Sequence, residues 1–172
     1  LSVRAEPLEN ILNRALKRAF DIVFSLLVIV FVFSWLFPIL AILIKLESKG
    51  PVFFKQMRSG RDNHAFVCYK FRSMRTNKNL EHRQATLGDP RITKIGTFMR
   101  KTSLDELPQF FNVLMGNMSV VGPRPHMLSH TEQYSQLIDQ FMVRHFLKPG
   151  ITGWAQINGL RGETKTTEAM LE

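Results

Sequence analysis

Ile22 to Ile44 reads IVFSLLVIVFVFSWLFPILAILI, twenty-three residues without an ionisable side chain. A helix of about 20 apolar residues is long enough to cross the hydrocarbon core of a bilayer, so the run predicts a membrane segment. A buried helix of a soluble domain is the less favoured alternative. Pro38 lies inside the run, where its ring removes one backbone hydrogen bond and clashes with the preceding turn. We therefore expect the helix to kink or break at Pro38.

The run has cations on both sides, three before it and three after it: Arg14, Lys17, Arg18, Lys45, Lys49 and Lys55. Positive charge at both ends gives no clear orientation under the positive-inside rule. Two arrangements fit these flanks equally well. The segment could bend at Pro38 and return, with both ends on the cytoplasmic side, or it could be one kinked span.

The membrane segment has an amphipathic lead-in. Pro7 suits a first helical position, and apolar residues recur at three- and four-residue spacing from Leu8 to Phe20. Lys17, Arg18 and Asp21 lie within about one helical turn and are predicted membrane-interface residues. The spacing of Lys17 and Asp21 allows an ion pair. We favour the interpretation that both cations extend toward lipid headgroups and anchor the helix.

The bulk composition limits the domain organisation. The 172 residues have room for a membrane segment and one soluble domain, which we place at residues 1–48 and 49–172. Lys and Arg outnumber Asp and Glu by 23 to 14, and the net charge of +9 favours anionic partners. Cys68 is the single cysteine, which excludes an internal disulfide and suits a reducing compartment. Because the chain starts at Leu1 and stops in a helix-like segment, we expect a fragment with a truncated C-terminus.

The polar part of the chain predicts an α+β domain that is mostly helical. Residues 51–54 and 65–69 are typical of short strands around the turn-forming residues 59–63, which predicts a small β-hairpin. We expect a helical turn at 80–84 and another turn at 89–91. Apolar residues at helical spacing predict a helix over 137–147, which ends before Pro149 and Gly150.

A second informative stretch is SLDELPQFFNVLMGNMSVVGPRP, from Ser103 to Pro125. Ser103 and Glu106 fit a capping box, a purely structural interpretation. Pro108 instead favours a helix that begins just after Asp105 and Glu106. In both cases the carboxylates lie at a helix N-terminus, whose positive dipole end favours an ionised aspartate nucleophile. The adjacent Glu106 can hold a divalent cation.

Basic residues surround this carboxylate pair in the sequence, as expected for groups that bind phosphate oxygens through charge-assisted hydrogen bonds. They are Lys70, Arg72, Arg91, Arg100 and Arg124. A solvated basic face is the alternative for each of them. Arg124 is the strongest candidate because Pro123 and Pro125 restrict its backbone. His126 and His130 have a spacing that could bind zinc, but no third ligand is evident.

The chain resembles the bacterial sugar transferases, the monotopic polyprenyl-phosphate phosphoglycosyl transferases. The resemblance is carried by seven motifs in one order: KRAFD (17–21), GPVFF (50–54), YKFRSM (69–74), DPR (89–91), SLDELPQ (103–109), VGPRP (121–125) and KPGITGW (148–154). Chance agreement over so many motifs is very improbable.

The resemblance implies transfer of a sugar 1-phosphate from a UDP-sugar to polyprenyl (undecaprenyl) phosphate, the first membrane step of exopolysaccharide, capsule or O-antigen synthesis. Asp105 matches the family's nucleophile, which forms a covalent phosphosugar intermediate. Glu106 matches the residue associated with Mg²⁺. Lys70 and Arg100 fall in the matching motifs around the active site, and Arg124 matches an arginine linked to nucleotide or phosphate binding.

The family also implies a re-entrant membrane helix that is broken at a Ser-Pro pair and enters and leaves on the cytoplasmic side. In this chain Phe37 precedes Pro38, and Ser34 lies one turn earlier. We expect the bacterial inner membrane as the location, with the catalytic domain on its cytoplasmic face. Expected partners are the UDP-sugar, the polyprenyl phosphate and membrane phospholipid, and a homo-oligomer is compatible with the sequence.

Two alternatives to this reaction remain open from the residues. The first is a non-catalytic, membrane-tethered basic module that binds acidic lipid or nucleic acid, which would use the net charge but leave the carboxylate pair without a role. We therefore do not expect a nucleic-acid partner. The second is a direct, single-displacement transfer in which Asp105 acts as a general base.

Overall fold

The computed structural model describes residues 10–76, 86, 88–125, 147–153 and 157, and it has the α+β architecture that the sequence predicts. The helical turn expected at 80–84, the His126–His130 pair and nearly all of the helix expected at 137–147 lie outside the described residues. The described elements are α1 (Ile11–Val28), the π-helical segment η2 (Ile29–Phe33), α2 (Ser34–Glu47), β1 (Phe53–Ser59), the 3-10 helix η3 (Arg61–Asn63), β2 (Ala65–Phe71), α3 (Lys94–Thr102), the 3-10 helix η5 (Leu104–Glu106), α4 (Gln109–Met115), β3 (Ser119–Val121) and β4 (Gly150–Thr152).

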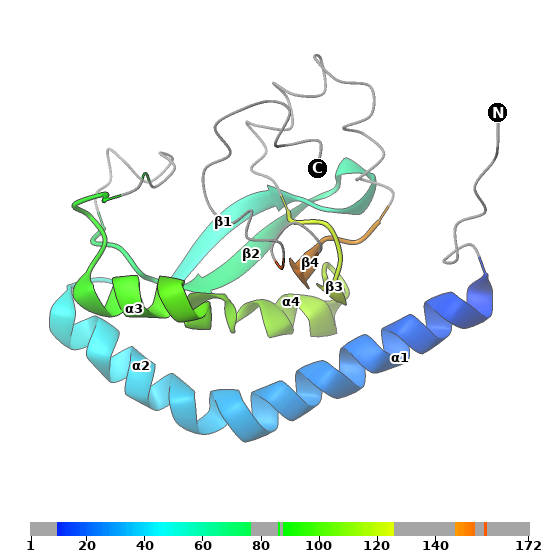
Figure 1. The fold of residues 1–172 in the computed structure, drawn as a ribbon, viewed down its shortest axis with the longest axis horizontal. Helices are drawn as coiled ribbons and strands as arrows, with labels where there is room; N and C mark the ends of the chain where they lie inside the picture. The colour runs from blue at the N-terminus through cyan, green and yellow to red at the C-terminus, as the bar shows by residue number, and fades with distance from the viewer. Residues whose placement is uncertain (1–9, 77–85, 87, 126–146, 154–156, 158–172) are drawn as a thin grey trace, which may run out of the picture.

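A bent, continuous helix runs through α1, η2 and α2 and underlies the rest of the fold (Figure 1). Its concave side faces α3 and α4. The helix begins after Asn10, whose side chain accepts a hydrogen bond from the Leu12 N–H at 2.9 Å. The sequence-based prediction of a long apolar helix is therefore confirmed.

The bend has a local cause near Pro38. A proline ring clashes with the carbonyl four residues earlier, here that of Ser34, and cannot donate to it. The turn before Ser34 is widened into η2, where the Ser34 N–H bonds to the Ile29 carbonyl in the π pattern. Proline and π-bulges are the usual origins of helix kinks, and here the two lie in succession. The helix bends ahead of Pro38 and stays helical through it.

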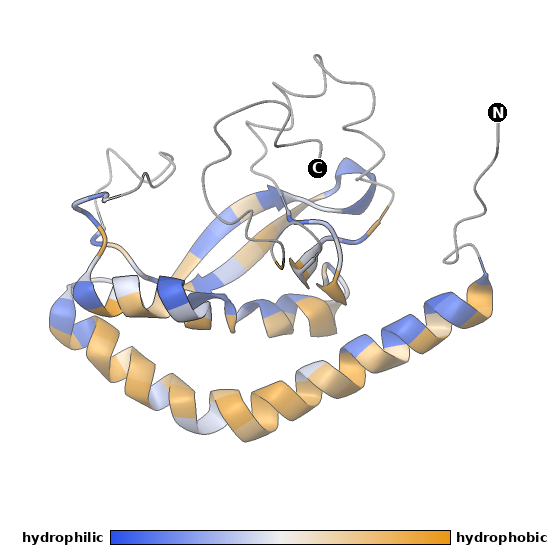
Figure 2. Ribbon diagram, in the orientation of Figure 1, coloured by the Kyte–Doolittle hydropathy of each residue, from blue (hydrophilic) through white to orange (hydrophobic). Residues whose placement is uncertain are grey.

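The convex side of this helix is apolar and exposed. The helix spans 37 residues and is long and apolar enough to cross a membrane. Figure 2 shows hydrophobic residues over η2 and most of α2, and polar residues returning along the N-terminal part of α1. Among its exposed large side chains are Phe20, Val23, Leu27, Phe31, Trp35 and Ile42. A surface of this kind is typical of contact with lipid.

The predicted hairpin is confirmed and is longer than expected. Strands β1 and β2 pair antiparallel from Phe53 opposite Phe71 to Ser59 opposite Ala65. The turn contains Asp62 and Asn63 with φ of 53° and 60°, the left-handed region that Asp and Asn tolerate better than most residues.

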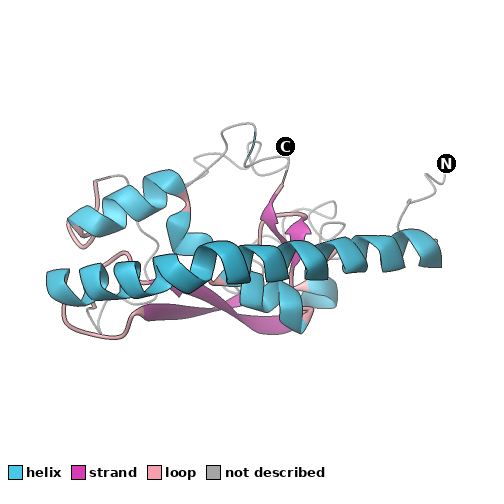
Figure 3. Cartoon of the chain, turned by 90° about the horizontal axis from the view of Figure 1, so that it is seen from below, coloured by secondary structure: helices cyan, strands magenta, loops and turns pink. Residues whose placement is uncertain are grey.

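Helices α3 and α4, which lie between β2 and β3 in the sequence, pack on the hairpin and the bent helix (Figures 1 and 3). Phe66, Cys68 and Phe110 belong to one buried cluster, against which Val28 and Ile29 of the bent helix pack. A second cluster unites side chains from the bent helix, β2 and α3: Phe33, Leu40, Ile44, Phe71 and Met99. The bent helix is therefore part of the hydrophobic core of the domain.

Strands β3 and β4 form a separate parallel pair, with Ser119 opposite Gly150 and Val121 opposite Thr152. The backbones approach closely here: a Cβ on Gly122 or Gly150 would collide with main-chain atoms of the facing segment. This pair leads directly into the loop that contains Arg124.

Candidate active site

Asp105 and Glu106 lie in a short 3-10 turn between two helices. Helix α3 ends at Thr102, and Ser103 takes the left-handed conformation with φ of 58°, which turns the chain. Helix α4 begins at Gln109 with Pro108 as its N-cap, so the carboxylates stand just ahead of it. The arrangement predicted from Pro108 is confirmed. A capping box would require Ser103 to be the N-cap of α4, and it is not.

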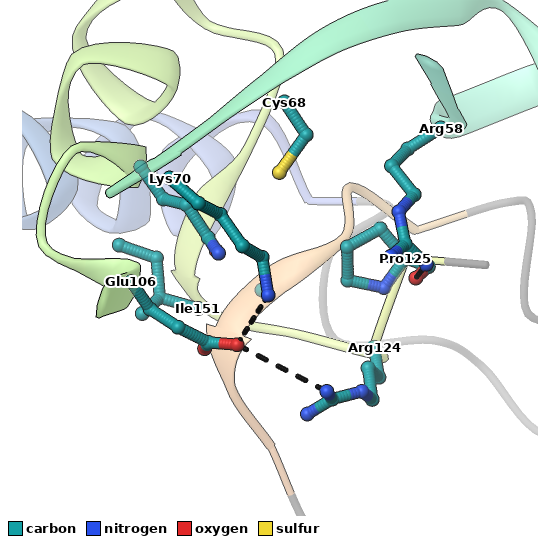
Figure 4. Close-up of a pocket in the computed structure, with 9 residues that line it drawn as sticks. Arg58, Cys68, Lys70, Glu106, Arg124, Pro125 and Ile151 are labelled. Carbon is teal, nitrogen blue, oxygen red and sulfur yellow. Dashed lines mark hydrogen bonds and ion pairs between the residues drawn. The ribbon is translucent and has the colours of Figure 1, made fainter. Parts of the chain in front are cut away.

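Glu106 is the centre of a charged pocket (Figure 4). Its Oε1 accepts a hydrogen bond from Lys70 Nζ at 2.6 Å and lies 3.9 Å from an Nη atom of Arg124. Lys70 comes from β2 and Arg124 from the loop after β3, so three separate parts of the chain meet here. The pocket is lined by Arg58, Cys68, Lys70, Glu106, Gln109, Arg124, Pro125, Gly150 and Ile151.

Asp105 is a buried carboxyl beside this pocket, with 8% of its surface exposed. Burial raises its pKa, the nearby Lys70 opposes that rise, and the Glu106 carboxylate adds to it. Arg100 on α3 is close enough to help lower the pKa again. Asp105 is therefore a carboxyl group whose charge is poorly solvated and held next to cations, as expected for a reactive group.

Glu106 responds in the opposite direction. Burial alone would raise its pKa, but Lys70 and Arg124 together outweigh burial and lower it below the ordinary glutamate value. The two adjacent carboxyls thus have pKa values shifted apart by their surroundings. Such divergence is typical of sites in which neighbouring carboxyls have different roles.

The donor set fits magnesium only as a site shared with substrate. Within residues 10–76, 86, 88–125, 147–153 and 157, no three His, Cys, Asp or Glu side chains gather as a metal site. Mg²⁺ is commonly held by one or two carboxylates, several waters and substrate phosphates, and Glu106 offers such a carboxylate. Because Lys70 donates a hydrogen bond to Glu106, a bound Mg²⁺ would have to replace that contact.

Two of the predicted phosphate-binding arginines lie elsewhere. Arg72 is 4% exposed and its guanidinium donates to the carbonyls of Ser48, at 2.7 Å, and Lys49 at the end of α2. Arg91 forms an ion pair with Asp89, in which Nη2 donates to Oδ2 at 2.5 Å. This contact holds the pKa of the Asp89 carboxyl well below its usual range. Arg100 is exposed on α3 and acts on Asp105 through a long-range electrostatic interaction.

The predicted membrane-interface residues contact the protein. Lys17 Nζ donates to the Ser119 hydroxyl at 2.6 Å and to the Val121 carbonyl at 3.0 Å. Arg18 donates to two carbonyls at the end of α4, those of Val113 at 2.6 Å and Leu114 at 2.8 Å. Asp21 accepts from Ser119 and from the Val120 N–H, both at 2.9 Å. These contacts attach α1 to β3 and to the end of α4, and a role of the three residues at the membrane interface stays a prediction.

Arg58 and Gln109 are pocket residues that the sequence analysis missed. Arg58 lies on β1, and Nη2 of its guanidinium donates to Gln56 on the same face of the strand at 2.6 Å. A polar Gln56–Arg58 alternation within a strand was the available signal, since residues two apart share a face. Gln109 is 2% exposed although polar, a pattern that sequence alone does not reveal.

Comparisons with known proteins show the family to which the chain belongs. The family model described as "Bacterial sugar transferase" matches residues 12–172. The chain is 56% identical over 165 residues to UDP-glucose:undecaprenyl-phosphate glucose-1-phosphate transferase of Escherichia coli (strain K12), covering 95% of this chain and 35% of that protein. The proteins of the same name from Klebsiella pneumoniae and Xanthomonas campestris pv. campestris are 54% and 53% identical, over 95% and 76% of this chain and 35% and 28% of their own lengths. The chain thus spans about a third of the length of these relatives, and it belongs to the bacterial sugar transferase family.

Proposed function

We propose that the chain transfers a sugar 1-phosphate, with glucose 1-phosphate as the first candidate, from a UDP-sugar to undecaprenyl phosphate. The observation that carries the proposal is the meeting of Glu106 with Lys70 and Arg124 in one pocket, with the buried Asp105 carboxyl directly beside it and within the electrostatic influence of Lys70. An anionic diphosphate suits a site in which cations outnumber carboxylates. The names of the relatives supply the donor and the acceptor.

The proposed reaction has two displacements at one phosphorus. An oxygen of the Asp105 carboxylate forms a bond to the sugar-proximal phosphorus, and the bond to the bridging oxygen breaks, so that UMP leaves with the electron pair. An oxygen of the lipid phosphate then attacks the same phosphorus and displaces the Asp105 carboxylate. Covalent catalysis of this kind divides one difficult step into two easier ones.

The surrounding groups have electrostatic roles in this scheme. Lys70 and Arg124 face the position where the phosphoryl oxygens would gather charge, and preorganised cations there stabilise the transition state. Glu106 would hold Mg²⁺ together with the donor phosphates, and the bound ion would neutralise part of their charge. Burial of Asp105 keeps water from competing for the phosphorus.

We further propose that the bent helix is re-entrant and that the domain faces the cytoplasm. One domain contacts both ends of the helix: Arg18 bonds to α4 near the start, and Glu47 accepts from the Lys94 and Ile95 N–H groups of α3 at the end. Two ends held by one soluble domain favour the same side of a bilayer. The cytoplasm is the side on which UDP-sugars are made, so the bacterial inner membrane is the proposed location.

Intact-protein mass spectrometry tests the reaction. The purified chain is incubated with magnesium and a panel of UDP-sugars without lipid acceptor, and the expected result is a mass increase of one sugar phosphate that is absent in Asp105→Asn. A panel is needed because a few hydrogen bonds decide among hexoses. Turnover with lipid but no adduct would favour direct transfer. Substantial activity in Asp105→Asn would contradict the role of Asp105.

A further inference from the structure

Arg124 lies between two residues that cannot donate a backbone hydrogen bond. Pro123 and Pro125 lack an N–H, so their carbonyls are the backbone groups by which the chain on either side of Arg124 can be held. The Pro123 carbonyl accepts from the Gly150 N–H at 2.8 Å, which continues the contact between β3 and β4. One side of the Arg124 loop is thus attached to backbone.

Arg58 holds the other side of this loop. Its Nη1 donates to the Pro125 carbonyl at 3.1 Å, while its Nη2 donates to Gln56 Oε1 at 2.6 Å. Figure 4 shows the Arg58 side chain extending from its strand to Pro125, and the Arg124 side chain directed toward Glu106. A side chain from the hairpin therefore completes the attachment of a loop that is 67 positions away in sequence.

The placement of Arg58 is electrostatically unfavourable in part. Burial lowers the pKa of Arg58 and the nearby guanidinium of Arg124 lowers it further, while Cys68 and the Glu106 carboxylate oppose both effects. A cation that is partly buried beside another cation needs strong hydrogen bonds to compensate. The contacts to Gln56 and Pro125 provide them and also fix the direction of the guanidinium.

Among the residues that the structure describes, the Arg124 side chain has one long ion pair. The side chain is 38% exposed and its ion pair with Glu106 is 3.9 Å long. At 3.9 Å the pair is an electrostatic attraction without a hydrogen bond, so it does not define where the guanidinium points. The direction of Arg124 must come mainly from its backbone.

We propose that Arg58 is the positioning residue for Arg124: by holding the Pro125 carbonyl, it fixes the loop so that the Arg124 guanidinium faces Glu106 and the diphosphate of the donor. The inference rests on the proposed function, which gives Arg124 the donor phosphates to bind. Arg58 acts through Arg124, so its contribution to donor affinity exists only while Arg124 is present.

A double-mutant cycle on donor affinity tests this dependence. UDP-glucose binding to the detergent-solubilised chain is measured by calorimetry in an Asp105→Asn background, which blocks the proposed transfer. Arg58→Ala is expected to weaken binding about tenfold, the usual effect of one hydrogen bond from a charged donor. Arg124→Ala also weakens binding, and the double variant is expected to bind no more weakly than Arg124→Ala alone.

Two further variants separate positioning from charge and from folding. Arg61→Ala removes a cation from the exposed turn of the same hairpin, where it pairs with Asp62, and is expected to leave affinity unchanged. Gln56→Ala removes the support of Arg58 but keeps both guanidinium groups, and it should weaken binding only where Arg124 is present. Thermal unfolding of each variant identifies any general loss of fold.

The outcomes distinguish this inference from the proposed function. Additive losses from Arg58→Ala and Arg124→Ala, or an equal loss from Arg61→Ala, would overturn the positioning role while leaving the transferase proposal intact. A chain with an unaltered Arg58 and Arg124 that binds no UDP-sugar would contradict the proposed function, and the inference with it.

Discussion

The side chains of Asp21 and Ser119, 98 positions apart in sequence, are joined by a buried hydrogen bond of 2.9 Å. Ser119 also accepts from Lys17 Nζ, and the Val120 N–H donates to the same Asp21 carboxylate. These bonds attach the N-terminal part of the bent helix to β3, the strand that leads into the Arg124 loop. The position of the pocket relative to the helix is therefore fixed by polar contacts as well as by the apolar core.

Replacing Ser119 with alanine should loosen this attachment. The change removes one donor to Asp21 and the acceptor of Lys17, and leaves a buried carboxylate with one hydrogen bond fewer. We expect the free energy of unfolding to fall by about 1–3 kcal/mol. Thermal unfolding in detergent measures it, with Thr102→Ala as the control, which removes a hydroxyl that donates only to backbone carbonyls of its own helix α3. Equal midpoints for the two variants would show that the network contributes nothing.

Arg72 and Arg124 should differ in what their loss costs. Arg72→Ala leaves the carbonyls of Ser48 and Lys49 without their guanidinium donor, so we expect stability to fall by about 2 kcal/mol while UDP-sugar affinity stays unchanged. Arg124→Ala should lower affinity and leave the unfolding midpoint almost unaltered. Calorimetric binding and thermal unfolding of both variants decide the matter. The reverse pattern would support the sequence-based prediction that Arg72 binds phosphate.

The ionised carboxylate of Asp105 should destabilise the folded chain at neutral pH. Because burial raises its pKa, the folded chain binds more protons at this site than the unfolded chain, so the stability it provides at low pH is lost as the pH rises through the raised pKa. Asp105→Asn cannot ionise, and its unfolding midpoint at pH 7 should exceed that of the unaltered chain. The difference should shrink toward pH 4, near the pKa of an ordinary aspartate.

Glu106→Gln should show the opposite sign and serves as the matched control. The pKa of Glu106 is lowered by Lys70 and Arg124 against the effect of burial, so its charge stabilises the fold above the ordinary glutamate pKa, and that stability is lost as the pH falls through the lowered value. The variant should therefore melt below the unaltered chain at pH 7. Midpoints that shift in the same direction for both variants would exclude the divergent environments described for the pair.

The comparison of sequence and structure separates local from long-range information. The hairpin was predictable because short apolar runs flank turn-forming residues, and the start of α4 was predictable from Pro108. Lys70 could be placed near Glu106 only through the resemblance to known transferases, since nothing local relates two residues 36 positions apart. The domain boundary after residue 48 and the roles of the site residues stay predictions.

Arg18 and Arg72 have the same kind of binding partner in the structure. Arg18 and Arg72 were interpreted as cations for lipid or phosphate, but both donate to backbone carbonyls at helix ends. A helix C-terminus presents unpaired carbonyls and the negative end of the dipole, so it attracts guanidinium groups, as an anion does. Sequence shows the cation but not the helix end that the fold brings to it.

Cysteine labelling decides whether both ends of the bent helix lie on one side of the membrane. Asn10→Cys and Lys49→Cys place a thiol at either exposed end, and the native Cys68 is buried and gives little background. Arg18 and Glu47 attach these ends to the same domain, whereas a single span would separate them by about 30 Å of hydrocarbon. A membrane-impermeant maleimide should therefore label both variants in inverted vesicles and neither in intact spheroplasts. One end labelled from each side would establish a kinked single span and would require the contacts of Arg18 or Glu47 to be broken in the membrane.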